Sequence, residues 1–176
     1  MGFLWGLVSS VARIVFLRGS PERIYYSRRL FIVSLLLAVL ASAAVQLLLF
    51  DDHPVFMLLR VFAELTMFML MMVVLTAKIA RFRLARMMLV LVLVSLLADI
   101  LLSAVGTVVS YRSAAPQVVD VIAYGVGAVA MYGAASVVAW GLQRSLPIGA
   151  GVMLLYLVTV LGLDMAFRGL YQIMAS

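Results

Sequence analysis

Five apolar runs, each long enough to cross a lipid bilayer, constrain this chain more than any other feature. Apolar residues make up 67% of its 176 residues, and charged residues make up 11%. An average soluble domain has roughly 25% charged residues, so this chain has too few polar groups to cover a soluble surface. A membrane-spanning helix needs about 20 mostly apolar residues. The composition therefore excludes a cytosolic domain, a disordered chain and a disulfide scaffold.

We predict an all-α fold, a polytopic membrane bundle of five transmembrane helices preceded by an N-terminal interfacial amphipathic helix. Residues 1–29 form this helix and a basic segment, and residues 30–176 form the bundle. Arg13 and Arg18 interrupt the apolar pattern of the first segment, which favours a helix lying on the membrane over a sixth span. The expected spans are residues 30–50, 55–77, 87–109, 118–142 and 146–167.

The positions of the basic residues orient the bundle, because cytoplasmic loops carry an excess of Lys and Arg. With five spans, the N-terminal segment and two of the connections lie on one side of the membrane. The other side receives only Arg112 and Arg168. We therefore predict a bacterial inner-membrane protein with a cytoplasmic N-terminus and a periplasmic C-terminus. The ten cations on the cytoplasmic side are Arg13, Arg18, Arg23, Arg28, Arg29, Lys78, Arg81, Arg83, Arg86 and Arg144.

The net charge of +6 would suggest nucleic-acid binding in a soluble protein. Here the cations sit between apolar runs, so topology explains them and we predict no nucleic-acid partner. Contact with anionic lipid headgroups is a second role for the same cations. The residues placed for lipid contact are Arg28, Arg29, Lys78, Arg81, Arg83 and Arg86.

Four ionisable residues fall inside the predicted spans: Arg60, Glu64, Asp99 and Asp164. Each costs at least about 2.5–3.5 kcal/mol in hydrocarbon, so each needs a partner or a function. Arg60 and Glu64 are four residues apart and can form an intramembrane salt bridge on one helix face. At 1.5 Å per residue, Glu64 and Asp99 both lie roughly 13–15 Å from the outer surface.

Further polar residues lie on the same helix faces, or at the same depth, as these four ionisable residues. Ser95, Asp99 and Ser103 recur every four residues, and Gln46 reaches the depth of Arg60. We favour a buried network that fixes helix packing. A proton or ion relay is a second interpretation, because one arginine cannot neutralise three carboxylates. A polar contact for another subunit is a third. The predicted network comprises Arg60, Glu64, Asp99, Asp164, Gln46, Ser95 and Ser103.

The fourth span is rich in small residues at a spacing that permits close helix approach. We favour a partner helix inside this chain, with a second copy as the alternative. Tyr124 and Tyr132 on the same span could bring hydroxyl groups into the bundle, although a tyrosine in a membrane core more often only packs. The small-residue pairs are Ala123/Gly127, Ala130/Ala134 and Ala135/Ala139.

No constellation of catalytic residues is visible. The chain has no cysteine, and its one histidine, His53, stands beside Asp51 and Asp52 in a short loop. Turn chemistry explains these residues as well as a metal would. We therefore predict that the protein is not an enzyme and has no catalytic residue, metal or cofactor.

The layout resembles that of bacterial Yip1-like membrane proteins. The resemblance rests on the segment Arg18-Gly19-Ser20-Pro21-Glu22-Arg23 before five spans, and on the basic connection Arg81-Phe82-Arg83. It covers the architecture of the whole chain and implies a five-span bundle associated with membrane organisation. It transfers no site residue, and the chain lacks the longer polar N-terminal region and the Pro-marked third span of that family.

Two classes of function remain. The first is a non-catalytic accessory, assembly or scaffold subunit that packs against other membrane proteins, other copies of itself or lipid. The second is a small oligomeric transporter or proton- or ion-conducting unit built on Arg60, Glu64, Asp99 and Asp164. An intramembrane enzyme acting on lipid has no supporting motif.

Overall fold

The computed structural model describes residue 6 and residues 9–13, 21–49, 54–76, 79, 81–112 and 116–175, with most of their side chains. The described residues form helices joined by short turns, which confirms the all-α prediction. The elements are η1 (Pro21–Arg23), α2 (Arg28–Leu49), α3 (Pro54–Thr76), α4 (Arg81–Arg112), α5 (Pro116–Leu142) and α6 (Leu146–Ala175).

The starts of three helices follow local sequence signals. Ser27 caps α2, because its hydroxyl oxygen accepts a hydrogen bond from the Leu30 amide at 3.0 Å and so satisfies one of the helix's first free donors. Pro54 and Pro116 are the first residues of α3 and α5. Proline fits there because the amide it lacks would have no helical partner.

The turn between α5 and α6 is closed by backbone hydrogen bonds. Gln143 has a φ of 54°, the left-handed conformation that commonly ends helices. The Arg144 amide then donates to the Ala139 carbonyl at 2.9 Å. The Gly149 amide donates to the Ser145 carbonyl at 3.3 Å as α6 begins. These bonds fix the position of the turn relative to both helices.

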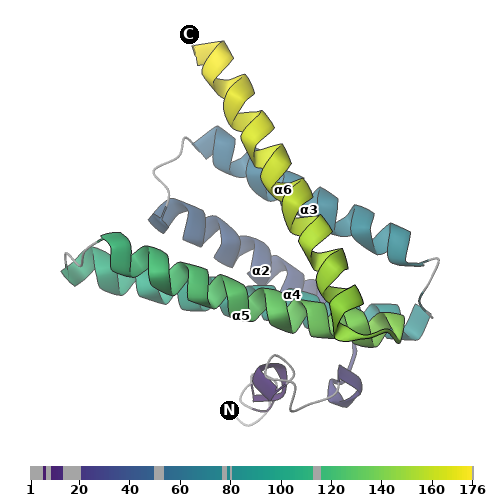
Figure 1. Ribbon diagram of the computed structural model, residues 1–176. Helices are drawn as coiled ribbons and strands as arrows, with labels where there is room; N and C mark the ends of the chain where they lie inside the picture. The colour runs from purple at the N-terminus through teal and green to yellow at the C-terminus, as the bar shows by residue number, and fades with distance from the viewer. Residues whose placement is uncertain are drawn as a thin grey trace.

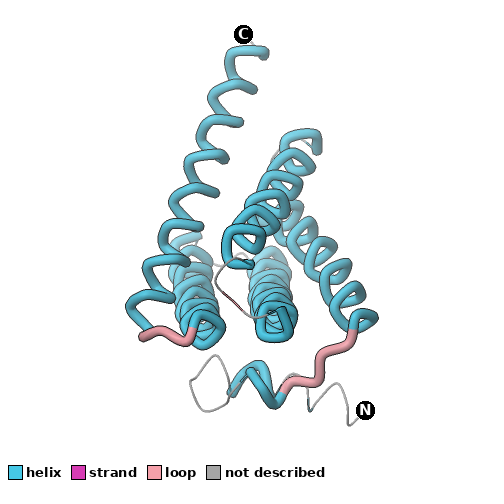
Figure 2. The backbone as a smooth tube through the Cα atoms, turned by 90° about the vertical axis from the view of Figure 1, so that its right-hand side faces the viewer, coloured by secondary structure: helices cyan, strands magenta, loops and turns pink. Residues whose placement is uncertain are grey.

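The five long helices form one bundle with two differing ends. The end at which α2, α4 and α6 begin is here named the basic end, because Arg28, Arg81 and Arg144 lie there. α4 is central and packs against α2 on one side and α5 on the other, while α6 packs against α5 and α3. Toward the opposite end, α3 and α6 diverge from α4 and α5 (Figure 1). Figure 2 shows the same divergence along the axes of α4 and α5.

The apolar core is concentrated in the half of the bundle next to the basic end. The largest side chains that are fully buried come from the first half of α4 and the last half of α5. Exposed apolar side chains occur along both halves of the bundle, as lipid contact requires. The fully buried side chains are Met87, Leu89, Val90, Val137 and Val138.

Part of the N-terminal segment is docked on the basic end. Residues 9–13 are helical, with Val11 buried and Arg13 exposed, as an amphipathic helix requires. Val11 and Ile24 belong to the apolar core. The Arg86 guanidinium donates to the Glu22 carbonyl at 3.2 Å and ties η1 to α4. Most of the predicted interfacial helix lies outside the described residues.

Four helices of the described chain are long and apolar enough to cross a membrane: α2, α4, α5 and α6. In α3 the described apolar stretch is shorter, Val61–Leu75. The helix that contains the third predicted span, residues 87–109, begins earlier, at Arg81. Arg, Leu, Ala and Met favour helix, so the expected basic loop forms the first turns of α4.

Candidate functional site

Polar side chains from four helices meet in a cleft between α2, α3, α4 and α6. Its volume is about 110 Å³. Ser42, Glu64, Ser95 and Tyr156 supply its polar groups, one from each helix, and we name it the polar cleft. The other lining residues are apolar: Leu35, Ala38, Val39, Val61, Leu65, Phe68, Leu91 and Val92.

The α2 wall of the polar cleft comes from one helical stripe. Ser34 and Ala38 are buried, and Ser42 follows at the same spacing of four residues. Side chains four apart share a helix face. The face of α2 that carries Ser34 and Ser42 therefore turns toward the neighbouring helices. Gln46 continues the stripe, but its side chain lies outside the described residues.

Glu64 lies on α3 and Asp99 on the neighbouring helix α4. They lie close enough for the charge of one carboxylate to act on the other. Ser95 lies one turn before Asp99 on the same face of α4, close enough for its hydroxyl to act on the Asp99 carboxyl. Glu64 and Asp99 are both half-buried, and charges interact far more strongly there than in water.

The remainder of the predicted α4 stripe does not reach the polar cleft. The Ser103 hydroxyl is buried and has no hydrogen-bond partner among the described atoms. The Thr107 hydroxyl is exposed and donates to the Ser103 carbonyl at 2.8 Å, which is bonding within one helix. Of the predicted network, Glu64, Ser95 and Asp99 are therefore brought together, and Ser103 is not.

The other members of the predicted network have side chains outside the described residues. These are Arg60, Asp164 and Gln46. Between side chains that the structure describes there is no salt bridge. The Arg60–Glu64 pair and the place of Asp164 in the network stay predictions.

Tyr156 is a cleft residue that the sequence prediction missed. Its ring lines the polar cleft beside Glu64. The sequence indicates Tyr124 and Tyr132 instead, and their side chains are 79% and 45% exposed. The prediction that they bring hydroxyl groups into the bundle is therefore wrong. Tyr124 lies on an exposed face of α5, and Tyr132 lies at the edge of the contact between α5 and α6. The spacing of residues in the sequence does not distinguish Tyr156 from Tyr124 and Tyr132. The crossing of α3 and α6 determines which tyrosine ring is enclosed.

The cations predicted for lipid contact gather at the basic end. Arg28, Arg29 and Arg81 are exposed, and Arg83 and Arg86 are half-buried. The Arg86 guanidinium lies 4.9 Å from the centre of the Phe82 ring. Such stacking holds the cation in place near a membrane surface. Lys78 lies outside the described residues.

The small-residue pairs of α5 divide between two environments. Ala134, Ala135 and Ala139 are buried. A Cβ atom added to Gly149 of α6 would strike the Ala135 carbonyl oxygen and lie 2.8 Å from the Ala139 Cβ. The favoured internal partner is thus confirmed for this half of α5. At Gly127 an added Cβ would meet nothing within 4 Å, so the Ala123/Gly127 pair is not packed against another described helix.

Long apolar helices, lipid-compatible exposed faces and a polar cleft inside the bundle define a polytopic helical membrane protein. No protein-family model, curated protein or solved structure matches the chain at a significant level. The resemblance to Yip1-like proteins therefore stays a prediction.

Proposed function

We propose that the protein is a non-catalytic membrane subunit, a five-span scaffold that packs against other membrane proteins, its own copies or lipid. The polar cleft serves to fix the packing of its helices. α3 is the fifth span, since its 23 residues match the length that a bilayer requires. The excess of cations at the basic end supports a cytoplasmic location for that end.

The observation that carries this proposal is the position of the polar cleft relative to the packed half of the bundle. Ser42, Glu64, Ser95 and Tyr156 bring one polar group each from α2, α3, α4 and α6 into the cleft, whose other lining residues are apolar. Hydrogen-bonding groups in hydrocarbon favour the arrangement that satisfies them. A polar cluster shared by four helices therefore selects one helix arrangement.

The closed half of the bundle argues against transport through a single copy. Met87, Val90 and Val137 are completely buried between the polar cleft and the basic end. Protein interiors packed in this way leave few voids larger than a water molecule.

The arginines at the basic end have a supporting role in this proposal. Arg28, Arg29 and Arg81 stand at the starts of α2 and α4, which pack side by side. Each cation close to an anionic membrane surface contributes about 1 kcal/mol of attraction. The cluster would hold the basic end against the negative leaflet and orient the scaffold.

The experiment replaces the two carboxylates by their amides. We expect Glu64→Gln and Asp99→Asn to lower the free energy of unfolding in mild detergent by about 1–3 kcal/mol, because each changes the donors and acceptors of a hydrogen-bonding group that is half-buried between helices. The amount of each variant in the membrane should fall as its stability falls. Thr66→Val is the matched control, since the Thr66 hydroxyl is exposed and bonds only to the Phe62 carbonyl of its own helix, at 2.7 Å. Carboxylate variants as stable as Thr66→Val would contradict a packing role.

A second candidate, a proton- or ion-conducting unit, is favoured by the closeness of Glu64 in the polar cleft to Tyr156, which also lines it, and to Asp99 outside it. Intramembrane carboxylates commonly mark ion pathways. In this case Asp99→Asn would abolish a flux while leaving the fold intact. Because the basic-end half of one copy is closed, the pathway would have to run between copies.

A further inference from the structure

We propose that the groove between α5 and α6 at the basic end binds one anionic phospholipid, with an acyl chain in the groove and the phosphate on Arg144. The inference is independent of the scaffold function. It begins from a groove of about 440 Å³ between the last half of α5 and the start of α6. The walls are almost wholly apolar, as an acyl chain requires.

The shape of the groove follows from the small residues beneath it. Gly149 brings the two helix backbones into direct contact at Ala135. Beside this contact, Ala135, Ala150 and Met153 form a buried or half-buried floor. Tyr132 and Leu154 form exposed rims. No other described helix contributes to the lining, so the groove faces the membrane.

The length of the groove fits one leaflet. It runs along α6 from Leu146 to Leu154, roughly 12 Å at 1.5 Å per residue. One leaflet accounts for about half of a hydrocarbon core about 30 Å thick. An acyl chain of one leaflet can therefore lie along the whole length of the groove.

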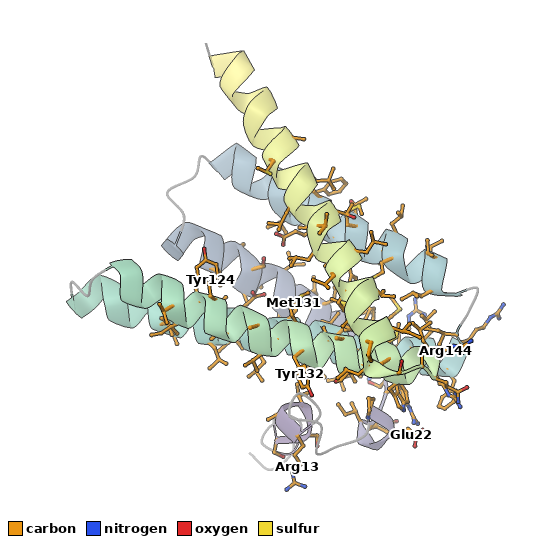
Figure 3. All side chains as sticks on the ribbon, viewed as in Figure 1. Arg13, Glu22, Tyr124, Met131, Tyr132 and Arg144 are labelled. Atoms are coloured by element: carbon orange, nitrogen blue, oxygen red, sulfur yellow. The ribbon has the colours of Figure 1, made fainter. Side chains whose placement is uncertain are left out.

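The mouth of the groove carries a positive charge. Arg144 is exposed and stands two residues before Leu146, at the turn between the helices (Figure 3). The hydrogen bond from its amide to the Ala139 carbonyl, 2.9 Å long, holds its backbone there. An arginine at the interface above an apolar groove complements a phosphate above an acyl chain.

The same charge disfavours a second copy as the occupant. Two copies in one membrane have the same orientation, and a two-fold contact through this groove would use the same surface on both. It would bring both Arg144 residues to the same level of the same interface. Like charges facing each other oppose such a contact, whereas an anionic lipid neutralises the charge.

The test is native mass spectrometry of the detergent-purified protein, titrated with phosphatidylglycerol or phosphatidylcholine of identical chains. We expect several-fold tighter binding of phosphatidylglycerol. Arg144→Gln should weaken phosphatidylglycerol binding about fivefold and leave phosphatidylcholine binding unchanged. The comparison variant is Arg81→Gln, which removes the same charge from the same end, outside the groove lining, and should weaken phosphatidylglycerol binding clearly less than Arg144→Gln does.

A second pair of variants tests the acyl-chain part. Ala150→Phe fills the groove and should weaken the binding of both lipids, whereas Gly151→Phe adds the same bulk to an open face of α6 and should not. Thermal unfolding of each variant shows whether it folds. If Ala150→Phe fails to fold, the comparison of Arg144→Gln with Arg81→Gln still tests the proposal. Equal losses in Arg144→Gln and Arg81→Gln would overturn the proposal in favour of a diffuse basic surface. A dimer that Ala150→Phe abolishes would overturn it in favour of a second copy.

Discussion

Gly149 shows at the scale of a residue how a missing side chain sets the distance between two helices. An added Cβ atom would meet the Ala135 carbonyl oxygen and the Ala139 amide nitrogen, the latter at 2.8 Å. Backbone atoms cannot move aside as the end of a flexible side chain can. The contact between α5 and α6 therefore depends on glycine at this position.

We expect Gly149→Ala to lower the free energy of unfolding by about 1–3 kcal/mol, the usual effect of overpacking a tight contact. The measurement is thermal unfolding in mild detergent. Gly151→Ala is the control on the same helix, because its new methyl group meets nothing within 4 Å. It should be neutral or stabilising by up to about 1 kcal/mol, since alanine favours helix more than glycine does. Equal stability of the two variants would show that α5 and α6 do not touch here.

At the scale of an element, the start of α2 depends on one cap. The Ser27 hydroxyl accepts the Leu30 amide hydrogen at 3.0 Å. Arg28 and Arg29 follow in the first turn, where positive charge is unfavourable for the helix dipole. The cap therefore stabilises a helix start at which Arg28 and Arg29 are unfavourable for the helix dipole. The same two cations are favourable near an anionic membrane surface.

We expect Ser27→Ala to destabilise the bundle by about 1 kcal/mol, because it leaves an amide donor of α2 without its partner. Ser27→Asp should retain the stability, since aspartate caps equally well and its negative charge suits a helix N-terminus. Thermal unfolding of both variants provides the comparison. If Ser27→Asp were as unstable as Ser27→Ala, the hydroxyl would not act as a cap.

The sequence predicts the elements better than it predicts their ends and contacts. Apolar runs of about 20 residues identify membrane helices because lipid excludes any open backbone. They cannot show that α4 begins at Arg81, because a helix can extend past the hydrocarbon wherever the residues favour it. Glu64 and Asp99, which have equal predicted depths, lie near each other on α3 and α4. The enclosure of Tyr156 and the groove beside Arg144 depend on how the helices cross. The spacing of residues along the sequence does not predict these crossings.

At the scale of the whole molecule, the bundle is packed at one end and divergent at the other. Leu89, Val90 and Val138 close the half next to the basic end. The polar cleft lies beyond this closed half, where α3 begins to diverge from α4. This arrangement suits a scaffold stabilised by polar contacts, and it gives a single copy no continuous route past its buried core.

Proton flux into liposomes tests this central claim most directly. The purified protein is reconstituted in liposomes that contain a pH-sensitive dye, and a membrane potential is imposed across them. We expect wild-type protein to give no more acidification than empty liposomes, and Asp99→Asn to give the same result. A flux through wild-type protein that disappears in Asp99→Asn, with thermal stability retained, would contradict the scaffold and establish the polar cleft as part of a conducting pathway.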